Sequence, residues 1–91
     1  MIHHIKGRLV EKSPTHAIIE ASGLGYFVNI SLITFSKLGN DENCKLYTHL
    51  SIKEDAHTLY GFAEKGEREI FRQLISVNGV GASTARIMLS S

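Results

Sequence analysis

The sequence predicts a mainly β fold that ends in helices, and three observations support this prediction. Short apolar runs separated by turn signals fill roughly the first sixty residues, as in small antiparallel β proteins. From Glu67 onward, apolar residues recur at helical spacing instead. The chain has 91 residues, of which 43% are hydrophobic. This is enough for one small domain with a modest core, or for one domain plus a fragment of another.

The first three strands are expected to form a meander. Residues 2–10 alternate loosely between apolar and polar, and residues 13–15 (Ser-Pro-Thr) mark the turn that follows. A second strand is expected over residues 17–21. Residues 22–25 (Ser-Gly-Leu-Gly) then turn the chain into a third strand over residues 26–30.

A short helix and two more strands complete the β part. Residues 31–38 have the imperfect apolar face of one or two helical turns, and residues 39–41 (Gly-Asn-Asp) are expected to end them. Residues 44–50 and 58–62 are predicted strands, joined by a polar segment centred on residues 53–55. Five strands with a short helical insert, in under about seventy residues, are typical of a small OB-fold barrel.

Two amphipathic helices are expected at the C-terminal end of the chain. The apolar face of the first consists of Ile70, Phe71, Leu74 and Ile75. Its polar face consists of Glu67, Arg68, Glu69, Arg72 and Gln73. Ser83 or Thr84 is expected to cap the second helix. The apolar face of that helix consists of Ala85, Ile87, Met88 and Leu89.

The loop between these helices, Asn78-Gly79-Val80-Gly81, is the most informative motif for function. Its glycines permit close approach of a partner, and the helix that follows presents free N–H groups and the positive end of its dipole. Val80 would plug the space between the helices. This helix-hairpin-helix interpretation predicts contact with a nucleic-acid backbone, although a plain glycine turn would give the same pattern. The candidate DNA-binding residues are Asn78, Gly79, Val80, Gly81, Ala82, Ser83 and Thr84.

Composition excludes several other classes of function. The formal net charge is +1, so no broad basic surface is expected and DNA binding must rely on local geometry. Cys44 is the single cysteine, which excludes an intramolecular disulfide, and a small buried apolar role is expected for it. No secretory signal or membrane-spanning run is present, so a cytoplasmic protein is the simplest expectation.

The histidines and aromatic residues are expected to have structural roles. His3 and His4 are adjacent in a predicted strand, so their side chains should diverge, and the five histidines have no metal-ligand spacing. No metal or other cofactor is therefore predicted. Four aromatic residues could form a base-stacking platform, but each lies within an apolar strand, which favours core packing. They are Tyr26, Phe27, Tyr47 and Tyr60.

The order of these elements, together with a series of short motifs, closely resembles the N-terminal part of the RuvA family over essentially the whole chain. The motifs are Gly7 with Glu11-Lys12, Gly23-Leu24-Gly25-Tyr26, Thr48-His49, Glu54-Asp55-Ala56, Leu59-Tyr60-Gly61-Phe62, Glu67-Arg68 with Phe71, Leu74-Ile75, Asn78-Gly79-Val80-Gly81 and Ile87-Met88-Leu89-Ser90. The resemblance implies an OB-fold domain over residues 1–63. It also implies the first helix-hairpin-helix of a truncated second domain over residues 64–91.

The resemblance assigns an acidic pin to Glu54 and Asp55. Four subunits would place these acids around a central axis, where like charge repels phosphates and holds a DNA junction open. Adjacent acids at a hairpin tip are otherwise an ordinary solvated turn. Both can face DNA only if the tip is a turn, because adjacent strand residues point to opposite faces. Lys53 is a candidate phosphate contact beside them.

The function implied by the resemblance is structure-specific binding of four-way (Holliday) junction DNA, with no intrinsic catalysis. The partners implied are the ATPase RuvB, the resolvase RuvC and three further copies in a homotetramer. RuvB would dock on a domain that these 91 residues do not contain, and the second hairpin is also missing, so the chain is expected to be a fragment or truncated product. Two alternatives stay open: a single-strand-binding OB module, and an oligomerising protein-interaction domain.

Overall fold

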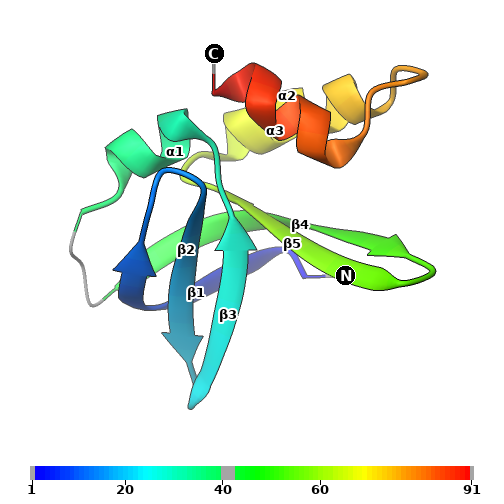
Figure 1. Cartoon of the computed structure of the whole chain (residues 1–91). Helices are drawn as coiled ribbons and strands as arrows, with labels where there is room; N and C mark the ends of the chain where they lie inside the picture. Colours follow the sequence, from blue (N-terminus) through cyan, green and yellow to red (C-terminus); the bar gives the residue numbers. More distant parts are fainter. Residues whose placement is uncertain (1, 40–42, 91) are drawn as a thin grey trace.

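The computed structural model describes residues 2–39 and 43–90 and shows a β-barrel with two helices packed on one end of it (Figure 1). The elements in chain order are β1 (His4–Lys12), β2 (His16–Ala21), β3 (Leu24–Asn29), α1 (Leu32–Lys37), β4 (Cys44–Lys53), β5 (Ala56–Phe62), α2 (Lys65–Ile75) and α3 (Ala82–Leu89). No helix in the described ranges is both long and apolar enough to cross a membrane.

The five strands close into a barrel in the order β1-β2-β3-β5-β4. Every neighbouring pair is antiparallel except β3 and β5, which run parallel where Asn29 faces Tyr60. Gly61 lies where β5 passes close to the core, since a Cβ there would come within 2.4 Å of Cγ1 of Val28. This closed barrel with a helix between β3 and β4 confirms the predicted OB-fold barrel followed by helices.

The main difference in strand boundaries lies in the β4–β5 hairpin. Its strands pair out to Lys53 and Ala56, well beyond the predicted ends at residues 50 and 58. The outer half of the hairpin is exposed on both faces, so it lacks the apolar alternation by which a strand is recognised in sequence. The expected helix around residues 31–38 is α1, with Ser31 as its N-cap. Asn40 and Asp41, expected to end it, lie outside the described residues.

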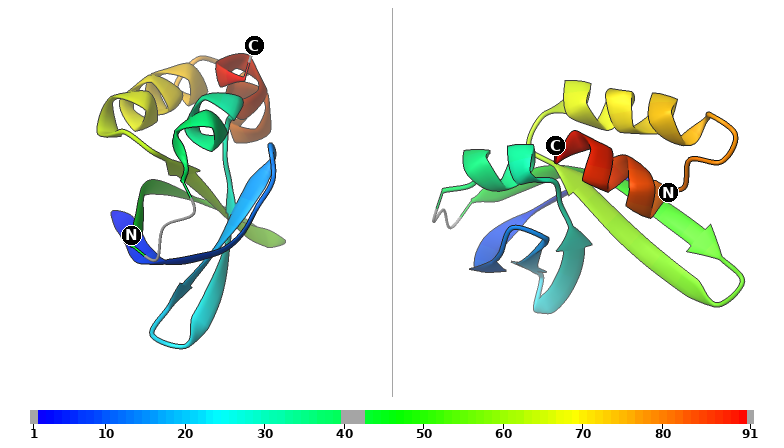
Figure 2. Two further views of the ribbon diagram at one scale, coloured as in Figure 1. Left: turned by 90° about the vertical axis from the view of Figure 1, so that its left-hand side faces the viewer. Right: turned by 45° about the horizontal axis from the view of Figure 1, so that its top comes forward.

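The buried apolar residues form two clusters. The first fills the barrel, and its members are Ile5, Ala17, Ile19, Val28, Ile30, Cys44, Leu46 and Leu59. The second joins the barrel to the helices through Tyr60, Phe62, Phe71 and Ala85. The ring of Phe71 lies 5.2 Å from that of Tyr60 and 4.9 Å from that of Phe62. The helical hairpin is therefore held against the end of β5, as two further views confirm (Figure 2).

The predicted faces of α2 are wrong at three positions. Glu67 and Arg68, expected on the polar face, are only 9% and 2% exposed, whereas Ile70 is 51% exposed. The carboxylate of Glu67 accepts hydrogen bonds from the hydroxyls of Ser31 and Thr34 on α1. Partners from α1 thus satisfy a charged group that helical periodicity alone would place in solvent.

Polar contacts also attach α3 to the barrel. Arg86 donates a hydrogen bond from Nη1 to the carbonyl of Ile30, at 3.1 Å. Near the end of α3, Oγ of Ser90 accepts a hydrogen bond from the main-chain N–H of Leu32, at 3.0 Å. The predicted apolar face of α3 is only partly buried, because Ile87 and Met88 are exposed.

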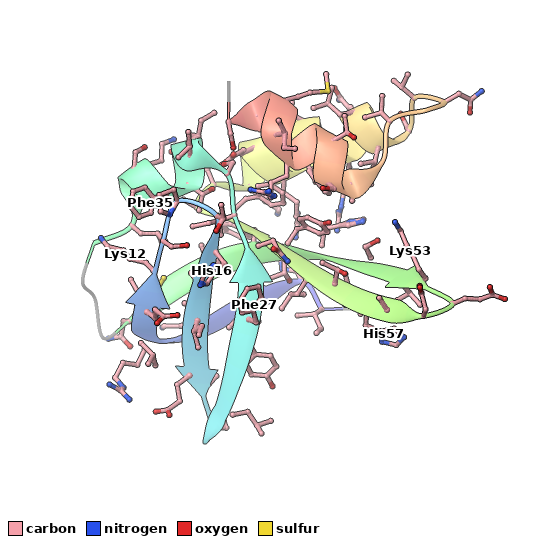
Figure 3. The ribbon with its side chains drawn as sticks, viewed as in Figure 1. Lys12, His16, Phe27, Phe35, Lys53 and His57 are labelled. Atoms are coloured by element: carbon pink, nitrogen blue, oxygen red, sulfur yellow. The ribbon has the colours of Figure 1, made fainter. Side chains whose placement is uncertain are left out.

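Two predictions for aromatic and histidine side chains are also wrong. The rings of His3 and His4 do not diverge, since their Nδ1 atoms lie 3.0 Å apart. Phe27 does not pack in the core: it is 55% exposed and stacks on His16, with ring centroids 4.5 Å apart (Figure 3). Tyr60 and Cys44 are buried as expected.

Candidate nucleic-acid interface

The loop between α2 and α3 has the backbone of a tight turn. The N–H of Val80 donates to the carbonyl of Val77, at 3.1 Å. Gly79 has φ of +86°, a conformation that strongly favours glycine. Gly81 is the N-cap of α3, so the prediction that Ser83 or Thr84 caps this helix is wrong. Both lie exposed within the first turn of α3 instead.

The start of α3 presents a group of free backbone donors. Around this loop, six main-chain N–H groups have no hydrogen-bond acceptor among the described residues, and they belong to Asn78, Gly79, Gly81, Ala82, Ser83 and Thr84. Gly81 has no side chain to cap the helix, and the first turn contains no acid. Because the N–H groups of Gly81–Thr84 lie at the positive end of the helix dipole, the loop favours an anion.

Open space lies over both glycines. A Cβ added at Gly79 or Gly81 would meet no described atom within 4 Å. Gly81 has φ of −86°, which any residue can adopt, so its value to the loop is the space over its backbone. Gly79 provides both that space and the positive φ. The two glycines therefore have separable roles.

Val80 and Asn78 occupy different environments in this loop. Val80 is half-buried and packs against the cluster of Tyr60, Phe62, Phe71 and Ala85, so it lies between the helices as predicted. Asn78 is exposed. One residue fixes the loop to the helices while its neighbours remain accessible to a partner.

The tip of the β4–β5 hairpin is a two-residue turn made by Glu54 and Asp55. Lys53 and Ala56 form the last pair before it. Both acids are exposed, and neither has an ion pair or a side-chain hydrogen bond among residues 2–39 and 43–90. Because turn residues do not alternate between the two faces of a strand, both acids can face the same partner, as the acidic-pin hypothesis requires.

The acidic tip and the glycine loop project at the same end of the molecule. Both lie at the right-hand side of Figure 1, and the rotated view at the right of Figure 2 agrees. The side chain of Lys53 points toward the side of the hairpin on which the loop lies, whereas His57 points the opposite way (Figure 3). A polyanion lying along this end would meet backbone donors at the loop and negative charge at the tip.

The pKa of His49, near the base of the β4–β5 hairpin, depends on burial and on two nearby arginines. Burial lowers the pKa of His49, and the charges of Arg72 and Arg68 lower it further. Nδ1 of His49 lies 3.3 Å from Nε of Arg72, which donates to it. This contact needs a neutral imidazole acceptor, so the site favours neutral His49.

The sequence gives no signal for the residues that hold the loop in place. Arg86 and Ser90 bond to residues more than fifty positions earlier in the chain. Ser31 and Thr34 reach Glu67 across more than thirty positions. Local periodicity does not reveal such long-range contacts. The contacts of Arg86 and Ser90 fix α3, and with it the free donors, and the contacts of Glu67 fix α2.

These features define a class: a small OB-fold protein whose barrel supports a helical hairpin with a glycine loop. A sequence profile described as RuvA N terminal domain matches residues 1–61. The chain belongs to this family. It is 67% identical to the Holliday junction branch migration complex subunit RuvA of Christiangramia forsetii and 63% identical to that of Flavobacterium psychrophilum, in each case over the whole chain.

A third relative, the subunit of the same name in Bacteroides fragilis, is 55% identical over the whole chain. The alignments cover 47%, 47% and 45% of these three relatives. The chain thus spans about half the length of the curated relatives that it matches.

Proposed function

We propose that this chain binds four-way DNA junctions by their structure, as the N-terminal part of the junction-recognising subunit of a RuvAB branch-migration complex. The observation that supports this most directly is the group of unpaired N–H donors at Gly79 and Gly81–Thr84, in a loop without acids. Backbone donors contact phosphates without reading bases, as binding by DNA structure requires. The names of the relatives agree with such a partner.

The seven loop residues have distinct parts in this proposal. The N–H groups of Gly79, Gly81 and Ala82 approach a phosphate, and the hydroxyls of Ser83 and Thr84 add donors in the first turn of α3. Val80 positions the loop through its packing, and exposed Asn78 borders the phosphate. The positive end of the α3 dipole strengthens each contact.

Glu54 and Asp55 act as an acidic pin in this proposal. Four copies in a homotetramer bring four such tips together at the point where the DNA arms cross. Their charge repels the phosphates there and favours an open junction over a continuous duplex. Lys53 is the candidate phosphate contact beside the tip, and its side chain points toward the glycine loop (Figure 3).

The remaining partners follow from the same assignment. The chain itself is non-catalytic, and ATP hydrolysis belongs to the motor RuvB, which docks on a domain outside these 91 residues. RuvC acts on the same junctions.

We propose residues 1–63 as the OB-fold domain and residues 64–91 as the first hairpin of a second domain. The complex works in recombination and repair in the cytoplasm, and the chain needs no cofactor.

A gel-shift comparison of a four-way junction with a linear duplex of the same arm sequence tests this function. We expect the chain to bind the junction more tightly at equal salt, because a glycine loop and a repelling tip select geometry rather than bases. Equal affinities for the two DNAs would contradict the proposal. Since salt strongly affects all such affinities, the comparison is made at one fixed salt concentration.

One observation favours a second candidate, a single-strand-binding OB module. Phe27 is exposed and stacks on His16 on the outer surface of β2 and β3, the strands with which OB folds bind oligonucleotides. If this pair stacks on unpaired bases, Phe27→Ser will weaken binding to a single-stranded oligonucleotide and leave junction binding unchanged. Unchanged single-strand binding would exclude this candidate.

A further inference from the structure

Two lysines without an ion pair or hydrogen bond to any described residue lie on the outer face of β1 and β4. The sequence has ten lysines and arginines, all within the described ranges. Six of them contact a carboxylate, a main-chain carbonyl or a histidine ring: Arg8, Lys12, Lys37, Arg68, Arg72 and Arg86. Four have no ion pair or hydrogen bond with any described residue: Lys6, Lys45, Lys53 and Lys65.

The register of β1 and β4 places two of these lysines directly opposite each other. Lys6 pairs with Lys45, and His4 pairs with Tyr47. Alternation along each strand puts all four side chains on the outer surface, which we name the basic face. Like charges directly opposite on a sheet destabilise the pairing. A bound anion would remove this repulsion.

Further cationic groups lie beside the basic face at the start of α2. Cζ of Arg68 lies 5.6 Å from the centroid of the Tyr47 ring, and Nζ of Lys45 lies 5.0 Å from it. The ring of His3 is 6.1 Å from the same ring. Burial lowers the pKa of His3, as do the charges of Arg68, His4, Lys65 and Lys45, in that order. Cationic groups therefore extend from the strands to Arg68 on α2.

Acidic groups do little to balance this charge. Glu69 is the described acid nearest to Arg68, at 3.7 Å from its Nε, and it also approaches Nη1 of Arg72 at 3.6 Å. The buried Nε of Arg68 has no hydrogen-bond partner among the described residues. Two of the four lysines without a described partner, Lys6 and Lys45, thus lie side by side on one face of a chain with a formal charge of +1.

We propose that the basic face binds the sugar–phosphate backbone of duplex DNA, as a second contact surface separate from the glycine loop. This inference deepens the proposed function and depends on it for the identity of the partner. Lys6 and Lys45 neutralise phosphates, and the half-buried Tyr47 ring lies close to Lys45 and Arg68. None of these contacts reads bases, so the face holds any duplex arm.

The salt dependence of binding tests this proposal, because each phosphate contact adds about 0.9 to the slope of log affinity against log salt. We expect Lys45→Gln to lower the slope by about 1 and the double variant Lys6→Gln/Lys45→Gln to lower it by about 2. The matched control is Lys37→Gln, which removes the same charge from an exposed ion pair with Glu64 and should leave the slope unchanged. Each is measured on a linear duplex and a four-way junction with the 91-residue chain.

The outcomes separate this inference from the proposed function. An unchanged slope in the double variant, with junction preference retained, overturns the basic face and leaves the junction function standing. A lowered slope without preference for the junction supports the basic face and contradicts the junction function. A chain that binds neither DNA contradicts both.

A protein partner would give a different result. If the double variant changes the sedimentation coefficient of the free chain and leaves the salt slope intact, the basic face joins copies of this chain and the DNA proposal is wrong. Folding of the variants is checked by their thermal midpoints. Removal of the Lys6–Lys45 repulsion should keep or raise the midpoint, so loss of structure is not expected to obscure the comparison.

Discussion

The glycine loop and the acidic tip are both short turns at one end of the molecule, yet they present opposite chemistry. The loop presents main-chain donors, and its conformation depends on Gly79 at φ +86° and on the packing of Val80. The tip presents two carboxylates on a turn in which neither residue has a positive φ. The chemistry of the loop depends on its backbone conformation, and that of the tip depends on the charge of its side chains. Substitutions should therefore affect binding affinity at the loop and selectivity at the tip.

The largest effect on binding is expected from Gly81→Val. The added side chain would fill the open space over the loop and block a phosphate, so junction binding should be lost. Because φ is −86° at this position, the cost to stability is limited to the poorer N-cap, about 1 kcal/mol. Gel shifts and thermal melts measure the two effects separately.

Two controls accompany this variant. Gly66→Val adds the same bulk at an exposed position on α2 with no described atom within 4 Å, and it should leave junction binding unchanged. Gly79→Ala should lower stability by about 1–2 kcal/mol, because it forces a side chain into a left-handed conformation. If Gly81→Val melts normally and still binds the junction, the loop does not contact phosphate through its backbone.

The next largest effect is on the support of the loop. Glu67→Ala removes the acceptor of two buried hydroxyl groups, those of Ser31 and Thr34, and should lower the free energy of unfolding by about 2–4 kcal/mol. Glu69→Ala is the matched control: its side chain is exposed, so a change within about 0.5 kcal/mol is expected. Chemical denaturation measures both. Equal effects for the two variants would mean that the buried contacts of Glu67 add nothing to stability.

A smaller loss of stability is expected at acidic pH. The folded-state pKa of His49 lies below its ordinary value of 6.5, so below that pH the unfolded chain binds the proton before the folded chain does. The free energy of unfolding should fall as the pH drops through this window, and it should be level in pH above it. His3 contributes with the same sign.

Denaturation at a series of pH values, in the wild type and in His49→Gln, measures the part due to His49. His3 titrates in both proteins, so it cancels in their difference. Parallel curves for the two proteins would show that His49 does not cause the loss.

The barrel was predictable from the sequence because its evidence is local. Apolar runs and turn signals indicate β1–β3 and the inner half of the β4–β5 hairpin, and the glycine loop is apparent from its motif. The outer half of the hairpin escaped prediction because pairing continues where neither face is buried. The two candidate turns were thus identified correctly, while the length of the arm that carries one of them was not.

In the helices, by contrast, local sequence patterns mispredicted which residues are buried and which residue caps α3. Helical periodicity placed Glu67 and Arg68 in solvent, but distant residues supply their hydrogen bonds and bury them. The cap of α3 was missed because Gly81 has no capping side chain, whereas Ser83 and Thr84 are residue types that usually cap helices. Preference by residue type fails here because a glycine without a capping side chain occupies the N-cap position.

The smallest change in affinity, and the most direct test of the division between loop and tip, is expected from Glu54→Gln combined with Asp55→Asn. In a RuvA protein of the relatives' full length that carries these residues, junction binding should stay the same or tighten, because repulsion of phosphate is removed and no attractive contact is lost. Linear duplex should then compete better. The measurement is a competition titration of four-way junction against duplex at fixed salt: we expect the affinity ratio to fall toward one in the double variant. An unchanged ratio would show that Glu54 and Asp55 are ordinary surface acids and would contradict the assignment of selectivity to the tip.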